Sequence, residues 1–239
     1  MSTIADNLSS VSARIRSAAL AAGRPENAVN LLAVSKTKPA DAIRDAHAAG
    51  QRHFGENYLQ EALAKQIELT DLELTWHFIG PIQSNKTRAI AEHFAWVHSV
   101  DRLKVAQRLA EQRPAELPPL NICLQVNISG EASKAGCDPA ELPTLAAAVA
   151  ALPNLRLRGL MAIPEPCADP QRQQAVFAQV KTLRDSLGLD LDTLSMGMSD
   201  DLEAAIAQGA TWVRIGTALF GARDYSKPSL KLPEHRKPA

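Results

Sequence analysis

The sequence has no excess of charge of either sign and no long apolar run. Its 239 residues contain 26 Lys and Arg against 26 Asp and Glu, so the formal net charge is zero and the isoelectric point is about 7.0. Nucleic acids and anionic membrane surfaces select basic patches, so neither is expected as a partner. No stretch approaches the ~20 apolar residues of a membrane-spanning helix, and the first residues lack the pattern of a secretory signal. We expect a cytoplasmic protein.

Cysteine pairs and several catalytic motifs are also missing. Cys123, Cys137 and Cys167 form no C-x-x-C pair, which argues against a disulfide framework or a thiolate metal site. The six histidines show neither H-x-H nor H-E-x-x-H spacing, so no metal site is expected. Without a G-x-S-x-G elbow or a Walker-type glycine loop, serine hydrolysis and nucleotide phosphoryl transfer lose their usual signatures.

What the sequence does contain is a regular alternation of apolar strands and helices. A first amphipathic helix carries Ile4, Leu8, Val11 and Ile15 at helical spacing. The predicted strands are NLLAVSK, RHFGENY, LTWHFIG, FAWVHSV, LNICLQVNI, LRLRGLMAI, LDTLSMGM and TWVRIGTALFG. The helices predicted between them are ADAIRDAHAAG and the segments around 84–93, from 101, from 139, over 170–187 and from 199. This alternation is typical of parallel strands joined by crossovers.

Eight strand-helix units in a chain of this length favour a closed barrel over an open sheet. A (β/α)8 barrel of the TIM type has about 250 residues, and no G-x-G-x-x-G follows the first strand. We predict one barrel domain over residues 1–225, with an extra N-terminal helix. Residues 226–239 are proline-rich, basic and without periodicity, and are predicted to be a disordered tail.

The active face of such a barrel lies at the carboxyl ends of its strands, where Lys36 is the most informative residue. Leu32, Val34 and Lys36 share one face of the first strand, so the amine continues an apolar row. Burial favours a neutral amine, the form that attacks an aldehyde to make a Schiff base. The simpler alternative is a lysine just past the strand that reaches water. Lys38 is expected to be such a solvated residue.

The last two strands supply a second set of polar groups. Arg214 shares a face with Trp212 and Gly216, so it places a guanidinium in an apolar strand and needs a partner. Gly216 and Thr217 follow in the region where these barrels commonly hold a phosphate.

Three further side chains near the strand ends have simpler interpretations beside a functional one. Ser199 comes close to the same corner after the seventh strand, but capping the following helix is the more common role for a serine at this position. His77 and His98 could line the mouth, although hydrogen-bonded strand histidines are the commoner case.

Several long motifs resemble the pyridoxal phosphate homeostasis protein family, whose members are single-domain barrels similar to the N-terminal domain of alanine racemase. The motifs are LLAVSKTKP, FGENYLQE, WHFIGPIQSNK, HSVDR, QVNISGEASKAG, RGLMAIP and LSMGMSDDLEAAIAQGATWVRIGTALFGAR. Together they cover residues 30–223 in the family's order, which is far more specific than one short pattern.

The resemblance implies a cofactor site for pyridoxal 5′-phosphate (PLP). It places the cofactor on Lys36 as a Schiff base and assigns its phosphate to Ser199, Gly216 and Thr217. Arg214 is expected near the pyridine nitrogen. The resemblance also places three residues around the ring: Asn57, His77 and Met161.

The implied role is vitamin B6 homeostasis in the cell without an established reaction, with PLP-dependent apoenzymes as potential recipients and a monomer as the expected state. An arginine at the pyridine nitrogen weakens the ring as an electron sink, and the chain shows no evident second acid or base.

The alternative is a weak racemase-like enzyme acting on amino acids. A third possibility is an aldolase-like barrel, in which Lys36 attacks a sugar carbonyl. This reaction would give Arg214 and the Gly216–Thr217 corner no cofactor to bind. Lys134 could act as a second, transient amine or be a solvated loop lysine.

Overall fold

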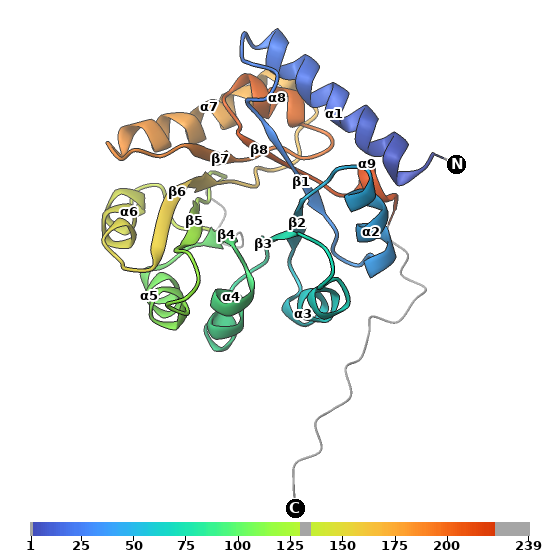
Figure 1. The fold of residues 1–239 in the computed structure, drawn as a ribbon. Helices are drawn as coiled ribbons and strands as arrows, with labels where there is room; N and C mark the ends of the chain where they lie inside the picture. The colour runs from blue at the N-terminus through green and yellow to red at the C-terminus, as the bar shows by residue number, and fades with distance from the viewer. Residues whose placement is uncertain (1, 130–134, 223–239) are drawn as a thin grey trace, which may run out of the picture.

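Eight parallel strands close into a barrel in the order β1 to β8, with β8 paired to β1, in the computed structural model of the chain (Figure 1). The structure describes residues 2–129 and 135–222. The strands are β1 (Asn30–Val34), β2 (His53–Glu56), β3 (Thr75–Phe78), β4 (Trp96–Val100), β5 (Leu120–Gln125), β6 (Leu155–Met161), β7 (Thr193–Ser195) and β8 (Trp212–Ile215). The predicted (β/α)8 barrel is thereby confirmed.

Helices follow the strands around the outside of the barrel (Figure 1). They are α1 (Ile4–Ala21), α2 (Ala40–Ala48), α3 (Leu59–Glu68), the 3₁₀ turn η1 (Ser84–Lys86), α4 (Thr87–His93), α5 (Leu103–Gln112), α6 (Leu142–Ala150), α7 (Pro170–Ser186), α8 (Leu202–Ala207) and α9 (Thr217–Phe220). In the part of the chain that the structure describes, no helix is long and apolar enough to cross a membrane. The predicted tail at 226–239 and Lys134 lie outside the described residues.

The extra N-terminal helix is confirmed as α1. Thr3 and Asp6 form a capping box, in which each side chain accepts a hydrogen bond from the other residue's backbone N–H. Leu8, Val11 and Ile15 are buried at helical spacing, and this face packs against α2, α8 and α9. The helix therefore covers the junction where the last strand meets the first.

One missed helix and two element boundaries differ from the sequence prediction. Helix α3 was missed, because its buried face includes Lys65, a charged residue that interrupts the apolar pattern. The last strand was predicted too long: it ends at Ile215, and 217–220 form α9. A buried apolar run does not by itself distinguish a strand from a helix, and Gly216 marks the change. Helix α8 begins at Leu202, so Ser199 is not its N-cap.

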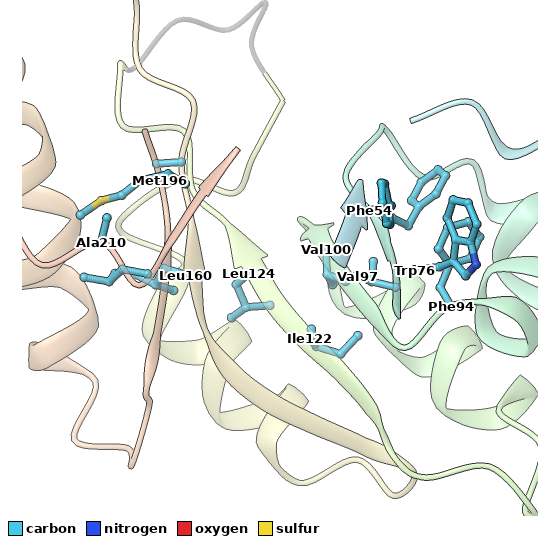
Figure 2. Packing of buried hydrophobic residues seen from close by; sticks show 14 of the residues in the cluster. Phe54, Trp76, Phe94, Val97, Val100, Ile122, Leu124, Leu160, Met196 and Ala210 are labelled. Carbon is cyan, nitrogen blue, oxygen red and sulfur yellow. The ribbon is translucent and has the colours of Figure 1, made fainter. Parts of the chain in front are cut away.

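The outer faces of the strands form the main hydrophobic core against the helices. Val213 and Ile215 belong to this core, whereas Trp212 and Arg214 alternate to the other face of β8. Figure 2 shows part of the core, with Phe54 beside Trp76 at a ring-centroid distance of 6.1 Å. This packed shell fixes the strands and leaves their carboxyl ends for function.

Polar and aromatic side chains contribute to the interior of the barrel. His98 of β4 contacts Ser195 of β7 through Nδ1 and Oγ at 2.8 Å. These strands are not neighbours in the barrel, so the contact crosses the interior. Both residues are fully buried, and each therefore depends on hydrogen bonds inside the barrel.

Candidate functional site

Lys36 lies two residues beyond the end of β1, in the turn that leads to α2. It is half-buried, and the residue after it, Thr37, has a φ of +65°, a left-handed conformation that is uncommon for a β-branched residue. The Ser35 N–H donates to the carbonyl of Gly55 at 3.1 Å, so the barrel pairing continues to the residue before Lys36. The turn that carries the amine is thus a defined piece of backbone.

A buried cluster of charged residues supports this turn from outside the barrel. Lys65 of α3 donates through Nζ to the Ser35 carbonyl at 2.8 Å, to Glu56 Oε1 at 2.7 Å and to Glu61 Oε1 at 2.6 Å. Glu61 also accepts from the Thr37 N–H at 2.6 Å. Lys65 therefore binds the backbone directly before Lys36, and its partner Glu61 binds the backbone directly after it.

The same cluster contains an ionisable group in an unfavourable environment. Burial raises the pKa of Glu56, and the neighbouring Lys65 ammonium opposes that effect. The Ser35 hydroxyl donates to Glu56 Oε1 at 2.6 Å, while Oε2 has no hydrogen-bond partner within the described chain. Removal of Lys65 would leave a buried carboxylate without its counter-charge.

Lys38 is half-buried and has protein partners that the sequence did not predict. Its Nζ donates to the carbonyl oxygens of Phe220, Gly221 and Ala222 at 2.9, 3.0 and 2.8 Å. These carbonyls lie at the end of α9, where a cation also suits the helix dipole. Lys38 therefore ties the turn after β1 to the helix after β8, and its role is structural.

Arg214 is buried in β8 and has the partners that the sequence required. Its Nη1 donates to the Ser195 carbonyl at 2.6 Å and to Ser195 Oγ at 2.9 Å, and its Nη2 donates to the Ala162 carbonyl at 2.9 Å. Within the described residues no hydrogen bond uses its Nε. Burial lowers the pKa of Arg214 to about 10, so the guanidinium is still cationic at neutral pH.

The residues predicted to bind the phosphate, Ser199, Gly216 and Thr217, lie just beyond the ends of β7 and β8, and we call this region the phosphate corner. Gly197 has a φ of +96°, and a Cβ there would lie 2.6 Å from the Cβ of Ala205, so glycine is required. Gly216 is close to β1, because an added Cβ would lie 3.3 Å from the Val34 carbonyl oxygen. Thr217 is exposed and opens α9. The corner therefore combines accessible backbone and a hydroxyl close to the turn of Lys36.

Ser199 and its neighbours shape the other side of this corner. Ser199 is half-buried, and its carbonyl accepts from Arg14 of α1 at 3.0 Å. The Met198 N–H donates to the carboxylate of Asp201, whose pKa is raised by burial. That carboxylate is engaged by the backbone of its own loop.

The three residues predicted around a ring come from different strands and differ in their surroundings. Asn57 directly follows β2, and its buried Oδ1 has no hydrogen-bond partner among the described residues. Met161 ends β6 and is fully buried against Trp96 and Cys123. His77 lies inside the barrel, hydrogen-bonded to two other histidines. The interpretation of His77 and His98 as hydrogen-bonded strand histidines is therefore confirmed.

Sequence reasoning missed the residues that support these groups. Ser195 holds Arg214, and Lys65 holds the turn of Lys36, yet neither was singled out. For Lys65 a usable signal exists, because Glu61 and Lys65 have the i,i+4 spacing of a helical ion pair. For Ser195, strand alternation places it on the same face as Thr193 but does not reveal its partner across the barrel.

Comparisons with known proteins agree with this geometry. The family described as alanine racemase, N-terminal domain, matches residues 7–224. The chain is 75% identical over 229 residues to the pyridoxal phosphate homeostasis protein of Pseudomonas aeruginosa, covering 96% of this chain and 100% of that protein. It is 58% identical over 233 residues to the protein of that name from Escherichia coli K12, covering 95% of this chain and 100% of that protein.

Solved structures give the same result. PipY of Synechococcus elongatus with PLP bound has a TM-score of 0.80 and 46% identity, covering 92% of this chain and 100% of that chain. Its form without PLP has a TM-score of 0.83 with the same identity and coverage. Alanine racemase from Streptomyces lavendulae is 21% identical with a TM-score of 0.68, covers 90% of this chain and 57% of that chain, and shares the fold.

Proposed function

The chain belongs to the pyridoxal phosphate homeostasis proteins, within the alanine racemase N-terminal domain family, and from this premise we propose that it binds PLP on Lys36 and keeps it available in the cell. The observation that carries the proposal is that Lys36, Arg214 and the phosphate corner lie at the same end of the barrel. PipY, at 46% identity, has been crystallised with PLP.

The residues present fit this cofactor. The orphaned Oδ1 of Asn57 lacks a donor, and Arg214 retains an unused Nε–H. Gly216 is half-buried and has no side chain of its own, so a phosphate could approach its backbone closely. When bound, PLP supplies an aldehyde that forms an imine with an amine and a pyridine ring that withdraws electrons.

The protein's own groups have separate roles in this proposal. Lys36 provides the amine, in a half-buried turn whose backbone Lys65 and Glu61 hold in place. Ser199, Gly216 and Thr217 bind the phosphate through hydroxyl and backbone donors. Arg214 donates to the pyridine nitrogen and, as a cation, opposes its protonation. Asn57 and Met161 line the ring pocket, and His77, which is buried in the barrel interior, supports it without contacting the cofactor.

The same arrangement supports a carrier over an enzyme. A substrate carbanion is stabilised best when the ring nitrogen is protonated, and a buried guanidinium disfavours that state. Racemisation also needs a second acid or base opposite the lysine. Among the described residues the only tyrosine is Tyr58, which directly precedes α3 and is half exposed. The cytoplasm is the compartment in which we place this role, with dependent apoenzymes as the recipients of PLP.

Lysine labelling tests the proposal. Purified protein loaded with PLP is expected to absorb in the visible, and borohydride reduction followed by peptide mapping should place the label on Lys36. Lys36→Ala should lose both the band and the label while retaining its circular dichroism spectrum. Lys104→Met, which changes an exposed lysine of α5, is the matched control and should keep both. Labelling of Lys38 or Lys134 with Lys36 unmodified would refute the assignment.

A further inference from the structure

Three histidines form a row across the interior of the barrel. His53 Nδ1 lies 3.1 Å from His77 Nε2, and His77 Nδ1 lies 2.9 Å from His98 Nε2. His98 Nδ1 then lies 2.8 Å from Ser195 Oγ, which accepts from Arg214 Nη1 at 2.9 Å. The row therefore connects β2, β3 and β4 to β7 and β8. It ends at the guanidinium of Arg214, the group proposed to contact the PLP ring.

The histidines lie in an aromatic environment that keeps them uncharged. His77 stacks on Trp96 with ring centroids 5.4 Å apart, and Trp212 lies 4.9 Å from His77 and from His53. Burial, with a contribution from Arg214, lowers the pKa of His98 to about 3. Burial also lowers the pKa values of His77 and His53. At neutral pH each ring thus has one N–H and one acceptor nitrogen.

Only one direction of hydrogen-bond donation along this row satisfies all of its groups, and we call this direction the polarity of the row. Arg214 has only donors, so it occupies Ser195 Oγ as an acceptor, and the Ser195 hydroxyl then needs an acceptor of its own. His98 Nδ1 is that acceptor, so His98 carries its proton on Nε2 and donates to His77 Nδ1. By the same step His77 donates from Nε2 to His53 Nδ1. The reverse polarity would leave the buried Ser195 hydroxyl without an acceptor among its observed contacts, which is unfavourable.

The outer end of the row approaches the other mouth of the barrel. His53 is half-buried and lines a cavity of about 450 Å³ together with Asn30, Gln51 and Arg52, at the amino-terminal ends of β1 and β2. This polarity leaves His53 Nε2–H as the donor at that end. The row therefore spans the interior from one mouth to Arg214.

We propose that His98, supported by His77 and His53, is a positioning residue that fixes the Ser195 hydroxyl toward the row and thereby holds the Arg214 guanidinium with its Nε–H free for the bound cofactor. The proposal rests on the proposed function for the identity of the ligand at Arg214. The histidines touch no cofactor atom in this account. They act through Ser195, and the oriented chain is strengthened because each hydrogen bond polarises the next.

The tautomers can be measured without any cofactor. Nitrogen-15 labelling of histidine and NMR of the apo protein at pH 7 are expected to give His53, His77 and His98 as neutral rings protonated on Nε2. Ser195→Ala removes the group that sets the polarity and should change the His98 signals first. A His98 ring that is charged, or that carries its proton on Nδ1, would overturn the proposal.

A pair of variants tests the effect on the ligand. His98→Gln supplies an acceptor for Ser195 and a donor for His77, whereas His98→Leu supplies neither. With Leu, the PLP dissociation constant should rise roughly tenfold and the visible band should shift; Gln should restore most of both. His93→Leu, which changes an exposed histidine of α4 outside the row, should leave the band in place.

Failure of this proposal and of the proposed function give different results. If wild-type protein shows no PLP band, the proposed function fails, and the tautomers are still decided by NMR. If wild type binds PLP and a folded His98→Leu variant keeps the same band and affinity, the positioning role is wrong. If His98→Leu does not fold, the comparison of His98→Gln with wild type and the NMR assignment decide the question.

Discussion

Lys65 Nζ lies 2.8 Å from the carbonyl oxygen of Ser35, the residue directly before Lys36. Lys65 is buried, and its ammonium also binds Glu56 and Glu61. A buried ion pair often adds no more stability than well-packed apolar side chains would, so what distinguishes Lys65 is the set of groups that it positions. We interpret Lys65 as the residue that holds the turn of the proposed cofactor lysine.

Replacing Lys65 should therefore affect both stability and the cofactor site. Lys65→Met is expected to lower the free energy of unfolding by about 3 kcal/mol or more, because Glu56 is left buried without its partner. It should also weaken PLP binding, since the turn loses its support. Lys181→Met, which removes an exposed ion pair, should cost less than about 1 kcal/mol. Adding Glu56→Gln to Lys65→Met should recover part of the loss in urea unfolding.

Lys38 provides a second structural test. Lys38→Met removes three hydrogen bonds to the carbonyls that end α9 and should lower the free energy of unfolding by about 1–3 kcal/mol. Because α9 follows the phosphate corner, PLP affinity should fall while labelling stays on Lys36. Thermal unfolding and a PLP titration measure the two effects. A variant as stable as wild type would contradict this role.

Gly216 tests the phosphate corner. A valine Cβ would lie 3.3 Å from the Val34 carbonyl oxygen, and its methyl groups would occupy space beside the backbone. Gly216→Val should weaken PLP binding by roughly tenfold or more and more than His77→Gln does, with a smaller effect on unphosphorylated pyridoxal. Fluorescence titrations with both ligands give the preference. The same preference for PLP over pyridoxal in wild type and variant would refute the assignment.

The buried histidines predict a loss of stability in acid. The pKa of His98 is lowered from 6.5 to about 3 in the folded protein. Below pH 6.5 the unfolded chain takes up a proton that the folded protein does not, so the stability present above that pH is lost as the pH falls toward 3. The slope is about 1.4 kcal/mol per pH unit for each such histidine.

Urea unfolding at several pH values between 7 and 4 measures this slope. His98→Gln should flatten it by about one proton, since the unfolded variant no longer takes up that proton. His93→Gln, at the exposed end of α4, is the matched control and should follow wild type. An unchanged slope in His98→Gln would show that His98 is not buried as a neutral ring.

Strand periodicity predicted the barrel and the position of Lys36 and Arg214 at one end of it, because parallel strands place their carboxyl ends together. It could not predict the contacts that cross the barrel. His98 and Ser195 are 97 residues apart and come from strands that are not neighbours, so no local pattern joins them. The partners of Lys38 were missed because the carbonyls that it binds are more than 180 residues away. The role of PLP came from resemblance, not from periodicity.

Proton exchange at the α-carbon of amino acids tests the central claim, that the protein carries PLP without turning over amino acids. Loaded wild-type protein is incubated with single L- and D-amino acids in heavy water, and the α-proton signal is followed by NMR. The proposed position of Arg214 at the ring nitrogen, together with the lack of an evident second acid or base among the described residues, predicts no exchange on the enzymatic scale. Exchange or racemisation of any amino acid at about one per second or faster would contradict the carrier account and support the racemase-like alternative.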